Sequence, residues 1–258
     1  MMRSRVPAPP LSAFVKVLWY ADGWAPAPNE RHMPDGSAGV IVALDGGWRA
    51  GPRAIVTGPR STSFVIGGAN VAGTLVGAQF THEGAAAFLD VPVSDLRNAQ
   101  APLSDLAGLS SARLVERLSA ASTADACLDL LEGWLRQRMR QRPGPDRSVV
   151  WAVHQLRRPR ARVADVAAQI GRSSRWFIDR FASDVGLTPK VFSRVQRFQW
   201  ALRNAHGRAS VSLADLAASA GYFDQAHLAH EFRMLAGLSP SALLAGRTEF
   251  LNHVVDRG

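Results

Sequence analysis

The chain of 258 residues has little of what covalent cross-links and membrane anchors require. Its one cysteine, Cys127, cannot form an internal disulfide, and such scarcity is typical of a reducing compartment. The first 14 residues lack the apolar core of a signal peptide. No run approaches the ~18 uninterrupted apolar residues of a membrane span. These absences predict a cytoplasmic protein without a membrane anchor.

Lysine is also scarce, since Lys16 and Lys190 are the only two among 30 basic residues. The net charge of +9 is distributed unevenly. Residues 1–135 hold 10 basic and 12 acidic side chains, whereas residues 136–258 hold 20 and 9. A basic half joined to a near-neutral half indicates a polyanion-binding module attached to a second domain. A merely solvated basic surface is the alternative, and charge alone does not decide between them.

The first half of the chain has the pattern of a β-rich fold followed by helices. Many short strands between turn residues are typical of a small sandwich or barrel, and a cupin-like barrel is one form we consider. From residue 83 onward, apolar residues recur at helical spacing. The expected strands are 14–20, 40–44, 55–57, 63–66 and 73–81, and the expected helices are 83–89, 92–98, 111–120 and 123–141.

Pro143-Gly144-Pro145 cannot continue a helix and therefore predicts a linker between domains. Residues 1–142 are expected to form a sensor or dimerisation domain, and residues 147–246 an all-helical domain with two helix-turn-helix units. The predicted fold class is thus α+β in two domains, with a β-rich N-terminal domain that ends in helices and an all-α C-terminal domain.

An internal repeat carries the functional argument. The segment VADVAAQIG at 163–171 matches LADLAASAG at 213–221 in five of nine positions. Beyond it the offset changes from 50 to 51, and Phe181 pairs with Phe232 and Pro189 with Pro240. The sequence Gly-Leu-Thr/Ser-Pro follows both units. One such pattern is a weak signal, but two in tandem are a strong one.

Each repeat has the residues that two closely crossing helices require. An alanine at the fifth position leaves room for the second helix, and a glycine at the ninth adopts positive φ at little cost. The second helix then buries Phe177 and Phe181, or Leu228 and Phe232, and leaves its outer face free. This is the helix-turn-helix plan, in which the second helix enters the major groove. The turn residues are Ala167, Gly171, Ala217 and Gly221.

A connecting helix over 189–205 is predicted to hold the two units apart. Thr188-Pro189 reads as an N-cap followed by proline at the first helical position. Two recognition helices on one side of the molecule can meet successive major grooves ~34 Å apart.

Residues 148–244, about 40% of the chain, resemble the C-terminal DNA-binding domain of the AraC/XylS family of bacterial transcription regulators. The most specific stretch is GYFDQAHLAHEFRMLAGLSP at 221–240. Three stretches of the first half, 30–36, 46–52 and 77–84, are similar to an uncharacterised N-terminal domain found on some of these regulators. The resemblance implies double-stranded DNA as partner, a small-molecule effector, a homodimer, and contact with RNA polymerase.

The sequence departs from the family where arginine often precedes the buried phenylalanine of each recognition helix, because Asp179 and His230 stand there. Asp179 could accept from a cytosine amino group or orient Arg175, which suits guanine. Asp224 is a base contact or a helix cap, and Trp176 and His227 read as packing or phosphate-contacting residues. The expected DNA contacts are Ser173, Ser174, Arg175, Asp179, Arg180, Gln225, Ala226 and His230, with Arg172 and Arg197 on phosphates, joined by Arg194, Arg203 and Arg233.

The alternative interpretation is an enzyme or a cupin-like small-molecule-binding protein with a helix-turn-helix tail. No catalytic set or phosphate loop is recognisable, so we expect no enzyme, no cofactor and no metal. The weak metal candidates are His32, His82 and Glu83, with Glu30 beside them. The aromatic residues Trp19, Tyr20, Trp24, Trp48 and Phe80 either line an apolar pocket or belong to the core, which is the commoner role.

Overall fold

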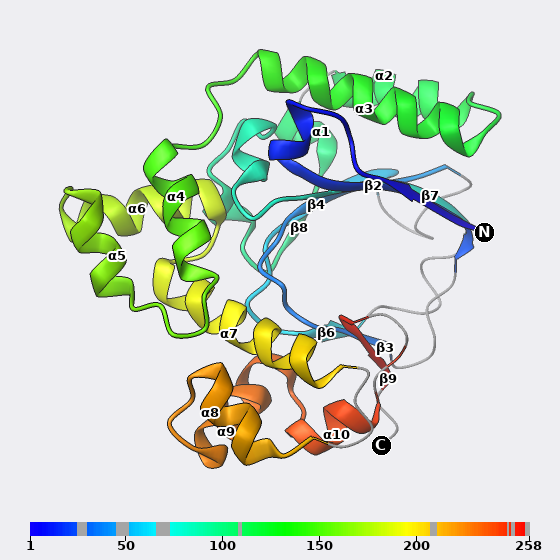
Figure 1. Ribbon diagram of the computed structural model, residues 1–258. Coiled ribbons are helices and arrows are strands. Elements are labelled where there is room, and N and C mark those ends of the chain that lie inside the picture. Colours follow the sequence, from blue (N-terminus) through cyan, green and yellow to red (C-terminus); the bar gives the residue numbers. More distant parts are fainter. Residues whose placement is uncertain are drawn as a thin grey trace.

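The computed structural model describes residues 1–24, 30–44, 52–65, 73–107, 110–206, 211–246, 248 and 251–255. The predicted two-domain α+β fold is confirmed, with a β-rich N-terminal part followed by helices (Figure 1). None of the described helices combines the length and the apolarity that crossing a membrane requires.

A six-stranded antiparallel sheet forms the centre of the N-terminal part. Its strand order is β1 (Met2–Arg5), β2 (Val15–Trp24), β7 (Gly73–Phe80), β4 (Gly39–Ala43), β5 (Ala54–Thr57) and β8 (Gln100–Pro102). The four inner strands match the predicted runs, whereas the edge strands β1 and β8 were not predicted. Along β7, Val76, Ala78 and Phe80 pack into the main core, while Leu75 joins a small cluster with Ala43.

Helices cover one face of this sheet. The predicted segments 83–89 and 92–98 form the 3-10 helices η2 (Gly84–Ala87) and η3 (Val93–Leu96), and a short helix α1 (Leu103–Ala107) follows. Helices α2 (Ser110–Ser119) and α3 (Ala124–Arg140) lie side by side across the sheet (Figure 1). Thr123 caps α3 by accepting from the Ala126 amide.

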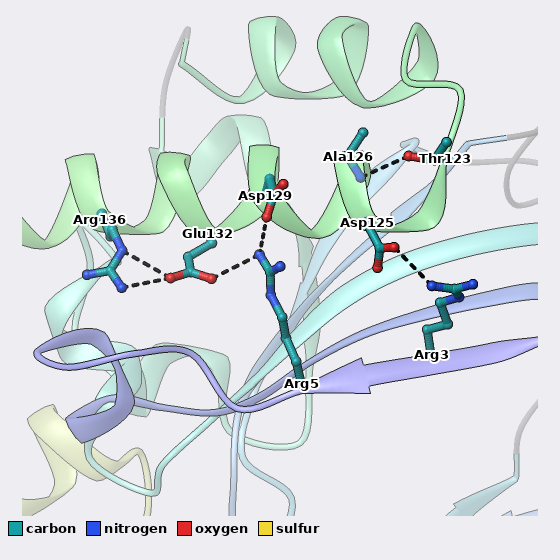
Figure 2. Close-up of polar contacts among 8 residues, drawn as sticks. All are labelled: Arg3, Arg5, Thr123, Asp125, Ala126, Asp129, Glu132 and Arg136. Carbon is teal, nitrogen blue, oxygen red and sulfur yellow. Dashed lines mark hydrogen bonds and ion pairs between the residues drawn. The ribbon is translucent and has the colours of Figure 1, made fainter.

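Ion pairs attach the edge strand β1 to α3 (Figure 2). Arg5 contacts Asp129 at 2.6 Å and Glu132 at 3.0 Å, and Arg3 contacts Asp125 at 2.9 Å. Because these pairs join residues more than 120 positions apart, they help to hold the start of the chain against the helical layer.

Among the described residues of the C-terminal part there are seven helices, and the predicted linker lies between the end of α3 at Arg140 and the start of α4. Helix α7 matches the predicted connecting helix 189–205, with one helical unit at each end (Figure 1). The helices are α4 (Arg147–Leu156), α5 (Val163–Ile170), α6 (Ser174–Val185), α7 (Pro189–Ala205), α8 (Leu213–Ala220), α9 (Gln225–Ala236) and α10 (Pro240–Ala245).

A second antiparallel sheet joins the two ends of the chain. Strand β3 (Glu30–His32) pairs with β6 (Phe64–Val65) on one side and with β9 (His253–Val255) on the other. Met33, just after β3, is fully buried in the C-terminal hydrophobic core. The N-terminal domain is therefore packed directly against the helix-turn-helix units.

Candidate nucleic-acid interface

The two predicted turns have the expected backbone conformation. Gly171 has a φ of 69° and Gly221 a φ of 78°, both in the left-handed region. Ala217 is 1% exposed where the second helix crosses, and Ala167 is partly buried against the same core. Both turns therefore have a left-handed glycine and an alanine packed against the core.

The inner faces of α6 and α9 pack on opposite ends of α7. Phe177 and Phe181 are buried on α6, and the Phe181 ring meets Phe192 of α7 edge-on at 5.5 Å. On α9, Phe232 meets Phe198 of α7 at 4.9 Å. Equivalent phenylalanines of the repeat therefore set the position of each recognition helix relative to α7.

A half-buried ion pair adds a second link between α7 and α9. Arg194 donates to both carboxylate oxygens of Glu231, at 3.0 and 2.8 Å. The Glu231 side chain is 8% exposed, and its hydrogen bonds raise the pKa of Arg194. Arg194 was expected on phosphate, but its guanidinium is engaged within the domain. The fork geometry of this pair fixes the orientation of α9.

The outer face of α6 presents the residues expected to contact DNA from the first unit. Ser173 caps the helix by accepting from the Trp176 amide at 3.2 Å, and Ser174 is exposed beside it. Arg175 is 92% exposed and its Nε lies 3.7 Å from an Asp179 carboxylate oxygen. This distance fits the interpretation in which Asp179 orients Arg175.

The outer face of α9 presents the corresponding residues of the second unit. Asp224 caps the helix by accepting from the His227 amide at 2.7 Å. A helix cap was one of the two roles predicted for it, and a base contact was the other. Gln225, Ala226 and His230 are exposed. Phe223, in the turn just before α9, is 92% exposed and was not singled out from the sequence.

The arginines expected on phosphates divide into two groups. Arg172 and Arg233 are exposed, with the Arg172 guanidinium 5.6 Å from the centre of the Trp176 ring. Arg197 instead lies over the Tyr222 ring at 5.5 Å with its Nε buried, and Arg180, which was expected among the contacts of the first recognition helix, contacts the buried Asp184 at 3.1 Å. These two half-buried side chains have packing roles that the sequence did not reveal.

The C-terminal ends of α6 and α9 face the N-terminal domain at equivalent positions of the repeat. A Cβ built at Gly186, after α6, would lie 2.3 Å from Pro59 Cγ. Gly237, after α9, lies against Arg31, and Ser63 donates through its amide to Leu235 O and through its hydroxyl to Ala236 O, both at 2.7 Å. The segment 59–63 thus contacts both units.

Histidines that were weak metal candidates have other surroundings. His82 is buried between the domains, and its Nε2 lies 3.1 Å from Gln196 Nε2. Glu30 contacts His253, and His32 packs between Phe64 and His253. Among the described residues, no group of three or more His, Cys, Asp or Glu side chains has a metal-binding arrangement.

The aromatic pocket candidates of the first half are packing residues where the structure describes them. Phe80 is fully buried and stacks on Phe88 at 4.8 Å. Trp19 lies against the backbone at Gly77, and Tyr20 packs on the main core. The Trp24 side chain and Trp48 lie outside the described residues.

Comparisons with known proteins assign both halves of the chain. Residues 166–246 match the family model of a helix-turn-helix domain, and residues 3–102 match a domain of unknown function (DUF6597). No curated protein matches the chain.

Solved structures give weaker matches. ToxT from Vibrio cholerae O395 aligns at 10% identity over 90% of this chain and 94% of that chain, with a TM-score of 0.40. Unsaturated fatty acid bound wild-type ToxT from Vibrio cholerae strain SCE256 aligns at 10% identity over 87% and 90%, with a TM-score of 0.39. Likenesses at this level support no statement about the function of the present chain.

Proposed function

We propose that this chain, whose C-terminal part is a helix-turn-helix domain of the AraC type behind an N-terminal DUF6597 domain, is a sequence-specific DNA-binding transcription regulator. One observation carries the proposal. Both recognition helices, α6 and α9, bury one face on α7 and expose the other from their first turn onward. Paired helices with free outer faces suit two major-groove contacts on one duplex.

We propose that the two domains on either side of the linker between α3 and α4 have different functions. Residues 147–246 bind DNA, and residues 1–142 bind a small-molecule effector or mediate dimerisation. The positive charge supports this division, since the excess of basic over acidic residues lies entirely after residue 135. A regulator of transcription acts beside the chromosome, so we place its action in the cytoplasm.

In the proposed complex, each recognition helix reads bases with the side chains near its N-terminus. Arg175 bridges guanine O6 and N7, with Asp179 as its orienting partner. Gln225 contacts adenine and Ala226 a thymine methyl. The further proposed contacts are Ser173, Ser174, His230 and Arg172, whereas Arg180 and Arg197 are better explained by their packing roles.

A gel-shift titration over salt, on duplexes selected from a random pool, tests the proposal. Wild-type protein is expected to prefer selected sites and to bind all duplexes more weakly as salt rises. Arg175→Ala should reduce discrimination at one base pair by about 1–3 kcal/mol. The matched control is Arg117→Ala, which removes an equally charged exposed side chain from α2. Arg175→Ala protein with an unchanged site preference would refute the proposed base contact.

The proposal includes a homodimer, with RNA polymerase as a further partner at the promoter. The edge strand β1 supports a dimer, because among the described strands it pairs only with β2, and Met1, Met2 and Val6 at its two ends are 68%, 61% and 71% exposed. Sedimentation velocity of the full chain, with and without Met2→Asp, measures this. A monomer at micromolar concentration in both would remove the dimer from the proposal.

A further inference from the structure

A pocket of about 560 Å³ lies at the junction of the two helix-turn-helix units. The turn between α4 and α5 forms one wall, and Trp200 of α7 and Ser219 of α8 contribute from the other side. Both units therefore line the same pocket. Most of the charged residues that line it belong to this turn, and they are Arg158, Arg160 and Arg162.

The turn is held in place by the second unit. Arg160 donates to Ala218 O at 2.9 Å, at the end of α8. A Cβ built at Gly221 would lie 3.2 Å from Pro159 O, so the backbones of the two units approach closely here. Arginines on a turn that is anchored in this way lose less side-chain and backbone freedom on binding a ligand.

The charge of the pocket points to an anion. Asp165 is the one carboxylate among its lining residues, against three guanidinium groups. Arg158 and Arg162 are exposed, and within the described part of the chain neither makes an ion pair. The planar fork of arginine matches the oxygen geometry of phosphate, and three such groups favour an anion with several charged oxygens.

We propose that this pocket binds a phosphate group, and that its source is the backbone of the duplex between the two sites read by α6 and α9. This inference rests on the proposed function. It adds a contact that requires the observed packing of the two units, because the pocket exists only where the α4–α5 turn meets α8. A free phosphate is the other source of the same chemistry.

The first arm of the test uses the full chain and duplex DNA. The double variant Arg158→Ala/Arg162→Ala is expected to weaken binding to a selected duplex and to an unrelated duplex by the same factor, about tenfold. The slope of log affinity against log salt should fall by about 1, as for one lost phosphate contact. The control Arg113→Ala/Arg117→Ala removes the same charge from α2. Equal affinities and slopes in the variant and the control would overturn the backbone contact.

The second arm uses inorganic phosphate without DNA and measures the unfolding temperature. A pocket that binds a phosphate group predicts that 10 mM phosphate, compared with chloride at equal ionic strength, raises the unfolding temperature of wild type more than that of the double variant, and equal rises would overturn the phosphate site. If the unfolding temperature rises more in wild type while the variant still binds duplex DNA with unchanged affinity, the pocket binds a free anion, and the proposal that the duplex supplies the phosphate group is overturned. If wild type binds no duplex at all, the proposed function fails, whereas this arm still decides whether phosphate binds.

Discussion

Gly171 and Gly221 occupy equivalent places in the two turns, with φ of 69° and 78°, yet their surroundings differ. A Cβ at Gly171 would meet no atom within 4 Å. A Cβ at Gly221 would lie 3.1 Å from Arg160 Cγ and 3.2 Å from Pro159 O. A substitution at Gly171 therefore tests backbone strain alone, whereas the same substitution at Gly221 tests backbone strain together with steric contact.

We predict that Gly171→Ala lowers the free energy of unfolding by about 1–2 kcal/mol, the cost of placing an L-residue in the left-handed region. Gly221→Ala should cost more, because the α4–α5 turn must also shift. Urea denaturation of both variants measures the difference. Equal losses of unfolding free energy in the two variants would mean that the α4–α5 turn shifts away from residue 221 at no cost.

The sequence predicted these turns because positive φ at the ninth position is a local requirement. It did not predict that Gly186 would meet Pro59, or that Arg197 would lie over Tyr222. Both contacts depend on how distant elements pack, which residue types alone do not encode. For the same reason, Arg180 and Arg194 were expected to contact DNA, whereas the structure pairs them with the buried carboxylates of Asp184 and Glu231.

At the scale of elements, α7 and α9 are joined by the Arg194–Glu231 pair as well as by aromatic packing. Arg194→Ala leaves the buried Glu231 carboxylate without its bidentate donor. We predict a loss of about 1.5–3 kcal/mol in the free energy of unfolding, the usual range for a hydrogen bond to a charged group.

Arg233→Ala on the exposed side of α9 is the control for Arg194→Ala and should change stability by less than about 0.5 kcal/mol. Chemical denaturation followed by circular dichroism provides the comparison. Indistinguishable losses in the two variants would show that the pair adds nothing to the link between the helices.

The longer elements were predictable, whereas the short strands β1, β3, β8 and β9 were not. Helix α7 was placed correctly from its N-cap and its apolar spacing, and the inner strands from their apolar runs. Strands β3 and β9 have three residues each, too few for an alternating pattern, and they pair across more than 200 positions. Their existence follows from the packing of the two domains, which no local pattern reports.

At the scale of the whole molecule, His82 lies at the contact between the domains. Its ring meets Phe192 edge-on at 5.1 Å, and Gln196 lies beside it and donates to Asp35 O. Burial lowers the pKa of His82 to about 4, because a charged imidazole would lose its hydration there.

The lowered pKa predicts a loss of stability in acid. Between pH 6.5 and about 4 the unfolded chain binds a proton at His82 and the folded chain does not, so stability falls as the pH drops through this window. His32, whose pKa burial also lowers to about 4, acts in the same direction.

Thermal unfolding from pH 7 to pH 4.5 checks this dependence. His82→Asn should be less stable at pH 7 but should lose less stability across the window than wild type. His230→Asn removes an exposed histidine from α9 and should keep the wild-type steepness. A His82→Asn profile parallel to that of wild type would mean that His82 is not what couples folding to protons.

The five residues from Pro59 to Ser63 reach α6 at one end and α9 at the other, each just where its helix stops. Under the proposed function, we expect a displacement of this segment to change the positions of both recognition helices, because it contacts the end of each. The two proposed DNA contacts would then change together, so a single displacement in the N-terminal domain would alter both at once.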